Sequence, residues 1–157
     1  MNQSNSPGAV VIDSNVLISI CSKESSRVTA DQALADYAAK QWPFYAPGVI
    51  VSEVLFVLCR KRSDGSLSAA EYDEGIEILK DQLTVILPPP RGDASLVQRA
   101  REIQSGYSCL HSADCLYVAL AEELAASGAA EFVTFDKRVV NVAAKNAPMV
   151  KVNLLPA

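Results

Sequence analysis

Short apolar segments alternate with longer stretches of helical periodicity along this chain of 157 residues, and this alternation restricts the fold most strongly. The segment 9–12, AVVI, is apolar at every position. A strand of this kind is buried on both faces, as in the centre of a parallel sheet. Because parallel strands are joined through helices, the alternation predicts an α/β fold, a three-layer α/β/α sandwich with a central, mostly parallel sheet.

The expected elements fill the chain without leaving room for a second domain. A capping box of Ser68 and Glu71 starts one helix, and Gly128 stops another. We find no internal repeat and no long linker, so 1–157 is expected to be a single domain in which 1–8 form a flexible leader. The expected strands cover 9–12, 43–46, 84–87, 131–135 and 150–154, and the expected helices cover 15–22, 29–41, 49–61, 68–82, 94–105, 113–126 and 138–145.

Charge and hydropathy exclude several classes of protein. The net charge of −4 argues against a protein that grips nucleic acid through bulk positive charge, although not against a nuclease whose acids hold metal ions. The longest apolar run, 115–121, is far shorter than the ~20 residues of a membrane helix. The N-terminus lacks the basic and apolar parts of a secretory signal, so we expect a cytoplasmic protein that does not associate with membranes.

The cysteines and the single histidine do not form a recognisable site. The four cysteines lack a CxxC pair and are expected to be reduced and mostly buried. Cys109, His111 and Cys115 lie close in sequence, but their spacing matches no usual zinc pattern. His111 would have to serve any Ser-His-Asp or Cys-His site, and the chain has no GxSxG-type elbow.

Two aspartates follow expected strands directly. Asp13 comes after the strand 9–12, and Asp136 comes after the strand 131–135. Ligands of open α/β sheets bind at the carboxyl ends of the strands, so both side chains should lie at one edge of the sheet. The alternative for each is an ordinary helix cap or turn residue.

Two further carboxylates lie on expected helices. Glu53 has only apolar neighbours one turn away on either side, namely Val49, Ile50, Phe56 and Val57. A carboxylate on such a face points to the core or a crevice wall and needs a partner or a metal. Asp114 lies in the first turn of its helix, where the helix dipole alone would favour it.

Taken together, the four acids favour a metal site. Two like charges ~4 Å apart repel by ~4 kcal/mol at an effective dielectric near 20, so such a cluster persists only if a cation offsets that cost. Carboxylates without His or Cys ligands suit a hard cation such as Mg²⁺ or Mn²⁺. Metal-bound carboxylate clusters serve phosphodiester hydrolysis.

Four segments in this order resemble the PIN domain, in particular the PIN-domain ribonuclease toxins of bacterial VapBC-type toxin–antitoxin pairs. They are VVIDSNVLIS, SEVLFVL, SADCLYVALAEELAASGAAEFVTFD and VKVNL, and the match covers nearly the whole chain. The resemblance implies a toxin of a type II toxin–antitoxin system that binds one or two Mg²⁺ or Mn²⁺ ions and cleaves single-stranded RNA. It also implies a cognate antitoxin and favours a homodimer.

The resemblance also assigns the site residues. Asp13, Glu53, Asp114 and Asp136 match the four acids of the family, while Asn15 and Thr134 match its polar residues beside the first and last acid. Asp13, Asp114 and Asp136 would be metal ligands or hold metal-bound waters. Glu53 would orient or deprotonate the attacking water, or ligate a second ion. The candidate RNA contacts are Arg60, Lys61, Arg62, Lys137 and Arg138.

Other functions remain open on the sequence. A haloacid dehalogenase-type phosphatase needs a second Asp two residues after the first, where this chain has Asn15. A receiver domain shows an acidic pair and a late Lys that are not clear in this chain. The remaining alternatives are a non-toxin PIN-domain RNA-processing nuclease and a catalytically silent PIN-fold binding subunit.

Overall fold

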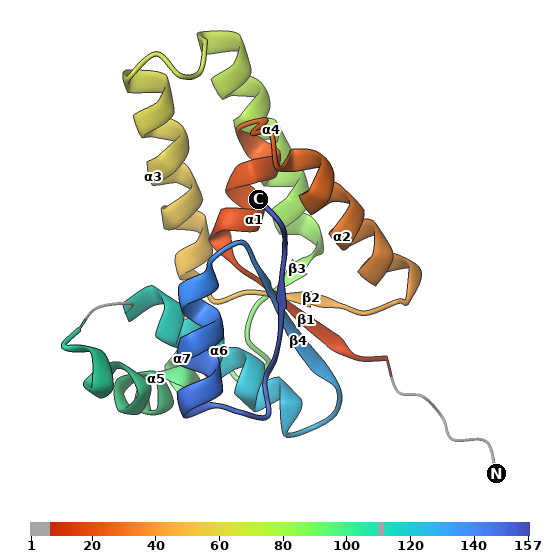
Figure 1. The fold of residues 1–157 in the computed structure, drawn as a ribbon. Coiled ribbons are helices and arrows are strands. Elements are labelled where there is room, and N and C mark those ends of the chain that lie inside the picture. Colours follow the sequence, from red (N-terminus) through yellow and green to blue (C-terminus); the bar gives the residue numbers. More distant parts are fainter. Residues whose placement is uncertain (1–6, 110–111) are drawn as a thin grey trace.

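The computed structural model describes residues 7–109 and 112–157, which form a sheet of five parallel strands in the order β3-β2-β1-β4-β5 (Figure 1). Most of the expected leader, 1–6, and His111 lie outside the described residues. The sheet confirms the predicted α/β fold with a central parallel sheet. The strands are β1 (Ala9–Ile12), β2 (Phe44–Tyr45), β3 (Ile86–Leu87), β4 (Ala130–Thr134) and β5 (Lys151–Leu154).

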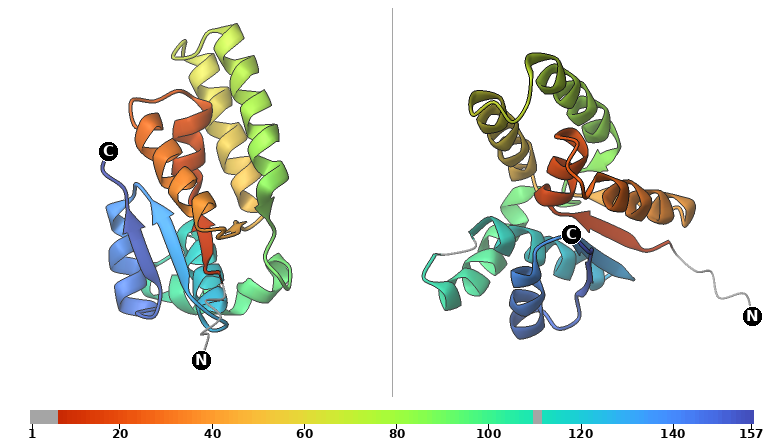
Figure 2. Two further views of the ribbon diagram at one scale, coloured as in Figure 1. Left: turned by 90° about the vertical axis from the view of Figure 1, so that its right-hand side faces the viewer. Right: turned by 45° about the horizontal axis from the view of Figure 1, so that its top comes forward.

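Helices cover both faces of the sheet. They are α1 (Ser14–Cys21), α2 (Arg27–Ala39), α3 (Val49–Ser63), α4 (Ala69–Val85), α5 (Val97–Gln104), α6 (Ser112–Ala125) and α7 (Lys137–Asn146), with short 3₁₀ helices at Asp93–Leu96 and Ser105–Tyr107. Figure 2 shows α1 and α2, red and orange, on one side of β1, and α6 and α7, cyan to blue, on the other. None of the described helices is long and apolar enough to cross a membrane.

The two core clusters follow the alternation of side chains along β1. Val10 and Ile12 are fully buried against α1 and α2, whereas Val11 points to the opposite face, where it packs with residues of α6. Helices cover both faces of β1, and this explains why its side chains are apolar on both faces. This arrangement makes the strand end, rather than a strand face, the place where a polar side chain can reach solvent.

The α3 and α4 helices extend beyond the sheet layers as a helical hairpin (Figure 1). The capping box predicted at the start of α4 is present: the Ser68 hydroxyl accepts from the Glu71 amide at 3.1 Å, and the Glu71 carboxylate accepts from the Ser68 amide at 2.7 Å. A glycine, Gly75, lets α4 lie against the end of α1, since a Cβ atom there would come within 2.6 Å of the Cys21 carbonyl oxygen.

The predicted strand 84–87 was partly wrong. Helix α4 continues to Val85, and the Thr84 hydroxyl donates to the Asp81 carbonyl at 2.6 Å inside the helix. Only Ile86 and Leu87 pair with β2. The β-branched residues favour a strand, but the hydrogen bonds of an established helix outweigh that weak preference until the backbone must extend before Pro88.

Candidate active site

The pairing of β1 with β4 brings two polar side chains together at the carboxyl end of the sheet. Ile12 lies opposite Val133, so Asp13 and Thr134 follow at the same level. The Thr134 hydroxyl donates to Asp13 Oδ2 at 2.6 Å. Asp13 is only 4% exposed, and although it precedes α1 it makes no capping hydrogen bond. The helix-cap explanation therefore does not account for this carboxylate.

The Asn15 side chain ties the two strand ends to each other. Its amide nitrogen donates to Asp13 Oδ2 at 3.2 Å and to Thr134 Oγ1 at 3.1 Å. Its amide oxygen accepts from the Phe135 backbone N–H at 3.1 Å. Asp13 Oδ2 is thus held by two donors, which fixes the direction of the carboxylate.

Asp13 shares its surroundings with two other acids. Burial raises the pKa of Asp13 to about 7; the hydrogen bond from Thr134 opposes the rise, and the charges of Asp114 and Glu53 add to it. Asp114 lies in the first turn of α6, and Glu53 lies on α3. We call Asp13, Glu53 and Asp114 the acid cluster.

Glu53 lies at the border between the core and the surface of the protein. Of its four apolar neighbours, Ile50 is buried but Phe56 is 61% exposed, so this face of α3 is only half covered. Burial still raises the pKa of the Glu53 carboxyl, and the charge of Asp114 raises it further. Its Oε1 accepts a hydrogen bond from the Tyr117 hydroxyl at 2.7 Å, which opposes that rise.

Asp136 plays a different structural part from Asp13. It caps α7, because its Oδ1 accepts from the Arg138 backbone N–H at 2.8 Å. The Arg138 guanidinium also donates to both carboxylate oxygens, from Nε to Oδ1 at 3.0 Å and from Nη2 to Oδ2 at 2.7 Å. The Asp136 amide donates to Thr134 Oγ1 at 2.9 Å, which links this residue to the Asp13 end of the sheet.

The two groups of basic residues lie at different distances from the acids. Arg138 contacts Asp136 directly. Lys61 forms an ion pair with Glu24 at 2.6 Å and, with Arg60 and Arg62, belongs to the last turn of α3. That turn is roughly 10 Å along the helix from Glu53. Only the group on α7 therefore adjoins the candidate site.

The donor set suits a hard cation, with one restriction on how it could be held. Within 7–109 and 112–157, no three His, Cys, Asp or Glu side chains are close enough together to bind one metal ion. Magnesium commonly keeps several of its waters and uses only one or two carboxylates together with substrate phosphates. The oxygen-only acid cluster, with the buried Asp13 beside like charges, fits that kind of site.

Two residues near the acids were not predicted. Tyr117 lies three residues after Asp114 in an apolar run, so its spacing marked it as core. Ser14 follows Asp13, and hydrogen bonding by its hydroxyl lowers the pKa of both Glu53 and Tyr117. The signal available in the sequence was the spacing, since a tyrosine three residues after Asp114 lies one helical turn away on the same side of the helix.

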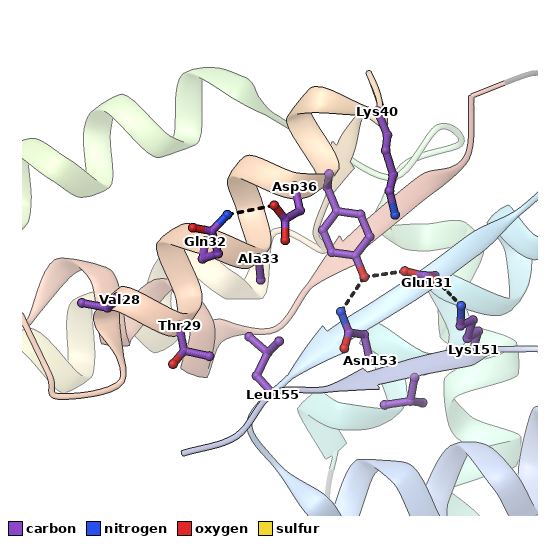
Figure 3. Close-up of a pocket in the computed structure, with 12 residues that line it drawn as sticks. Val28, Thr29, Gln32, Ala33, Asp36, Lys40, Glu131, Lys151, Asn153 and Leu155 are labelled. Atoms are coloured by element: carbon purple, nitrogen blue, oxygen red, sulfur yellow. Dashed lines mark hydrogen bonds and ion pairs between the residues drawn. The ribbon is translucent and has the colours of Figure 1, made fainter.

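A cavity of about 690 Å³ lies elsewhere, between α2 and the β4–β5 edge (Figure 3). Its wall includes Glu131, which accepts a hydrogen bond from Tyr37 and pairs with Lys151 at 2.7 Å. Asn153 donates to the Tyr37 hydroxyl at 2.8 Å. None of the four predicted acids lines this cavity, so it is separate from the candidate active site.

The raised pKa of Asp13 predicts how stability depends on pH without metal. Because the folded protein holds this proton up to about pH 7 and the unfolded chain only to about 3.8, stability should fall as pH rises between these values, by about 4 kcal/mol. Asp13→Asn should remove this slope and be more stable than wild type at pH 8. Urea unfolding in EDTA from pH 4.5 to 8 measures it.

A matched substitution separates a clustered acid from a capping acid. Asp136→Ala should lower stability at pH 8 by about 1 kcal/mol, because it removes the side-chain oxygen that caps α7. Parallel pH curves for wild type and Asp13→Asn would contradict the burial of a strained carboxylate.

Comparison with known proteins agrees with this architecture. The chain superposes on a crystal structure of VapBC2 from Rickettsia felis bound to a DNA fragment from their promoter, with a TM-score of 0.62 and 11% identity over 94% of this chain and 99% of that one. None of the curated proteins matches. The family model of the PIN domain matches residues 10–145, and the chain therefore belongs to the PIN domain family.

Proposed function

We propose that this protein is a metal-dependent endoribonuclease that hydrolyses RNA phosphodiester bonds, and the toxin of a type II toxin–antitoxin pair. PIN domains are generally nucleases, so a hydrolase is the starting point. The observation that carries the proposal furthest is the buried Asp13 carboxylate, held by Thr134 and Asn15 beside Glu53 and Asp114. Such clustering is costly for stability and is expected where charge is used in chemistry.

In this proposal Asp13, Asp114 and Asp136 hold Mg²⁺ or Mn²⁺, directly or through waters. When bound, such a cation neutralises phosphate charge and acidifies a water. Thr134 and Asn15 keep Asp13 oriented toward the ion. Glu53 orients or deprotonates the attacking water, or ligates a second ion. Asp136 caps α7 and also belongs to the proposed site. When RNA binds, Arg138 can leave the Asp136 carboxylate and contact an RNA phosphate instead.

The protein has a net charge of −4, so RNA would be held by the basic side chains beside the site rather than by the overall charge. Arg138, with an exposed side chain, is the first candidate for a phosphate contact, and Lys137 precedes it on α7. A bound RNA would reach Arg60, Lys61 and Arg62 only farther along its own chain, away from the cleaved bond. A cytoplasmic location follows from an RNA substrate.

The proposed partners are a cognate antitoxin and a second copy of the chain. The superposed R. felis structure is a VapBC2 complex, which supports an antitoxin by analogy. Helix α3 presents Val51, Leu55 and Phe56 to solvent near Glu53, a surface suited to a protein partner. An antitoxin segment covering the acid cluster would place a basic side chain near Asp13 or Asp114.

The proposed nuclease activity predicts that removing the charge of Asp13 strongly lowers the rate of RNA cleavage. Asp13→Asn should lower cleavage of single-stranded RNA at least ~100-fold, the scale of losing a catalytic electrostatic contact. Cleavage in Mn²⁺ or Mg²⁺, followed by gel electrophoresis, measures it, and EDTA should abolish it. Asp31→Asn is the matched control, because the exposed Asp31 on α2 pairs with Arg27 at 3.3 Å and does not belong to the candidate site. Full activity in folded Asp13→Asn would overturn the assignment.

The toxin role predicts a growth phenotype. Expression of the wild-type chain alone should slow bacterial growth, while Asp13→Asn should not, and co-expression of the adjacent small gene should restore growth. Growth curves of induced cultures measure this. Unchanged growth with an active enzyme would favour a housekeeping RNA-processing nuclease, and a folded but inactive protein would favour a silent PIN-fold binding subunit.

A further inference from the structure

We propose that Tyr117 is a positioning residue of the active site, whose hydroxyl holds the Glu53 carboxylate in the acid cluster. This inference rests on the proposed ribonuclease function and assigns a role to a residue that the four-acid pattern does not contain. Tyr117 does not reach the protein surface, because it is fully buried. It acts through Glu53 rather than on RNA.

The position of Tyr117 follows from two helices and a strand. On α6 it lies one turn after Asp114, so both side chains leave the same side of the helix. The Tyr117 ring stacks on Phe132 of β4, with centroids 5.8 Å apart and planes inclined by 17°. With the ring fixed in the core, the hydroxyl donates to Glu53 Oε1 at 2.7 Å across to α3. The contact joins residues 64 positions apart in the chain.

Electrostatics explains why Glu53 needs such a donor. Asp114 lies near enough for its charge to disfavour an ionised Glu53, and burial acts in the same direction. A glutamate side chain has several rotatable bonds, so repulsion would turn the carboxylate out toward solvent. A hydrogen bond to an ionised carboxylate is among the stronger ones in proteins and opposes this motion. Tyr117 thus keeps Glu53 near Asp13.

The chain offers a matched control for this contact. Tyr37 is also buried and also donates its hydroxyl to a carboxylate, that of Glu131. That pair lies in the cavity between α2 and the β4–β5 edge shown in Figure 3, away from the acid cluster. Phenylalanine at either position keeps the ring and removes one hydroxyl. Tyr37→Phe removes in addition the hydrogen bond that the hydroxyl accepts from Asn153, so the control loses at least as many contacts, but away from the acid cluster.

The test is steady-state RNA cleavage by Tyr117→Phe and Tyr37→Phe with saturating Mn²⁺. Tyr117→Phe should lower kcat about 10-fold or more with the RNA KM within about twofold, because the hydroxyl is out of reach of RNA. Tyr37→Phe should keep kcat within about twofold of wild type, even if its melting temperature falls as much as that of Tyr117→Phe. Glu53→Gln and the double variant Glu53→Gln/Tyr117→Phe should be equally slow. A Tyr117→Phe enzyme with wild-type kcat, or a double variant slower than Glu53→Gln by the full Tyr117 factor, would overturn the proposal.

A second measurement keeps the test independent of the RNA substrate. Urea unfolding in EDTA of wild type, Glu53→Gln, Tyr117→Phe and the double variant forms a double-mutant cycle. Non-additive midpoints are expected for Glu53 with Tyr117, and additive midpoints for Glu53 with Tyr37. Additivity in the first cycle would overturn the contact itself. A wild-type protein that cleaves no RNA yet shows the coupling would instead contradict the proposed function.

Discussion

The parallel pairing of β1 with β4 is the constraint on which the candidate site depends. Residues more than a hundred positions apart meet because Ile12 lies opposite Val133. Asp13 and Thr134 then leave the sheet side by side, and Asn15 bridges both. Both faces of β1 are covered by apolar packing, so the polar side chains of this segment gather where the strand ends. The helices α3 and α6 add Glu53 and Asp114 at that edge.

A carboxylate buried next to like charges lowers the stability of the folded protein, and hydrogen bonds from several surrounding residues offset part of that cost. Thr134 and Asn15 donate to Asp13, and Tyr117 donates to Glu53. These hydrogen bonds offset part of the burial, yet the pKa of Asp13 still rises to about 7. A divalent cation would supply the remaining compensation. Without one, the acid cluster is a source of strain that a proton partly relieves.

Asp13 could be placed at a strand end from a local signal, because it directly follows an apolar strand. Thr134 was indicated only by the resemblance to the PIN domain. Prediction from the sequence misplaced the strand 84–87, where helix continuation competes with β propensity. The role of Tyr117 could not be predicted, because helical spacing marks it as core and the direction of its hydroxyl depends on how α6 packs against α3. For Asp136, the sequence allowed a cap or a ligand; the structure has the cap, and the ligand role stays a prediction.

Thermal unfolding with and without Mn²⁺ tests the central claim, that Asp13, Asp114 and Asp136 hold a divalent cation. A cation bound only by the folded protein stabilises it by about 2.7 kcal/mol at a hundred-fold excess over Kd. For a domain of this size, the melting temperature should rise by roughly 5–10 °C, and Na⁺ at matched ionic strength should not reproduce the shift. Asp13→Asn should raise the metal-free melting temperature and shrink the response. An unchanged wild-type melting temperature in Mn²⁺ would contradict the account.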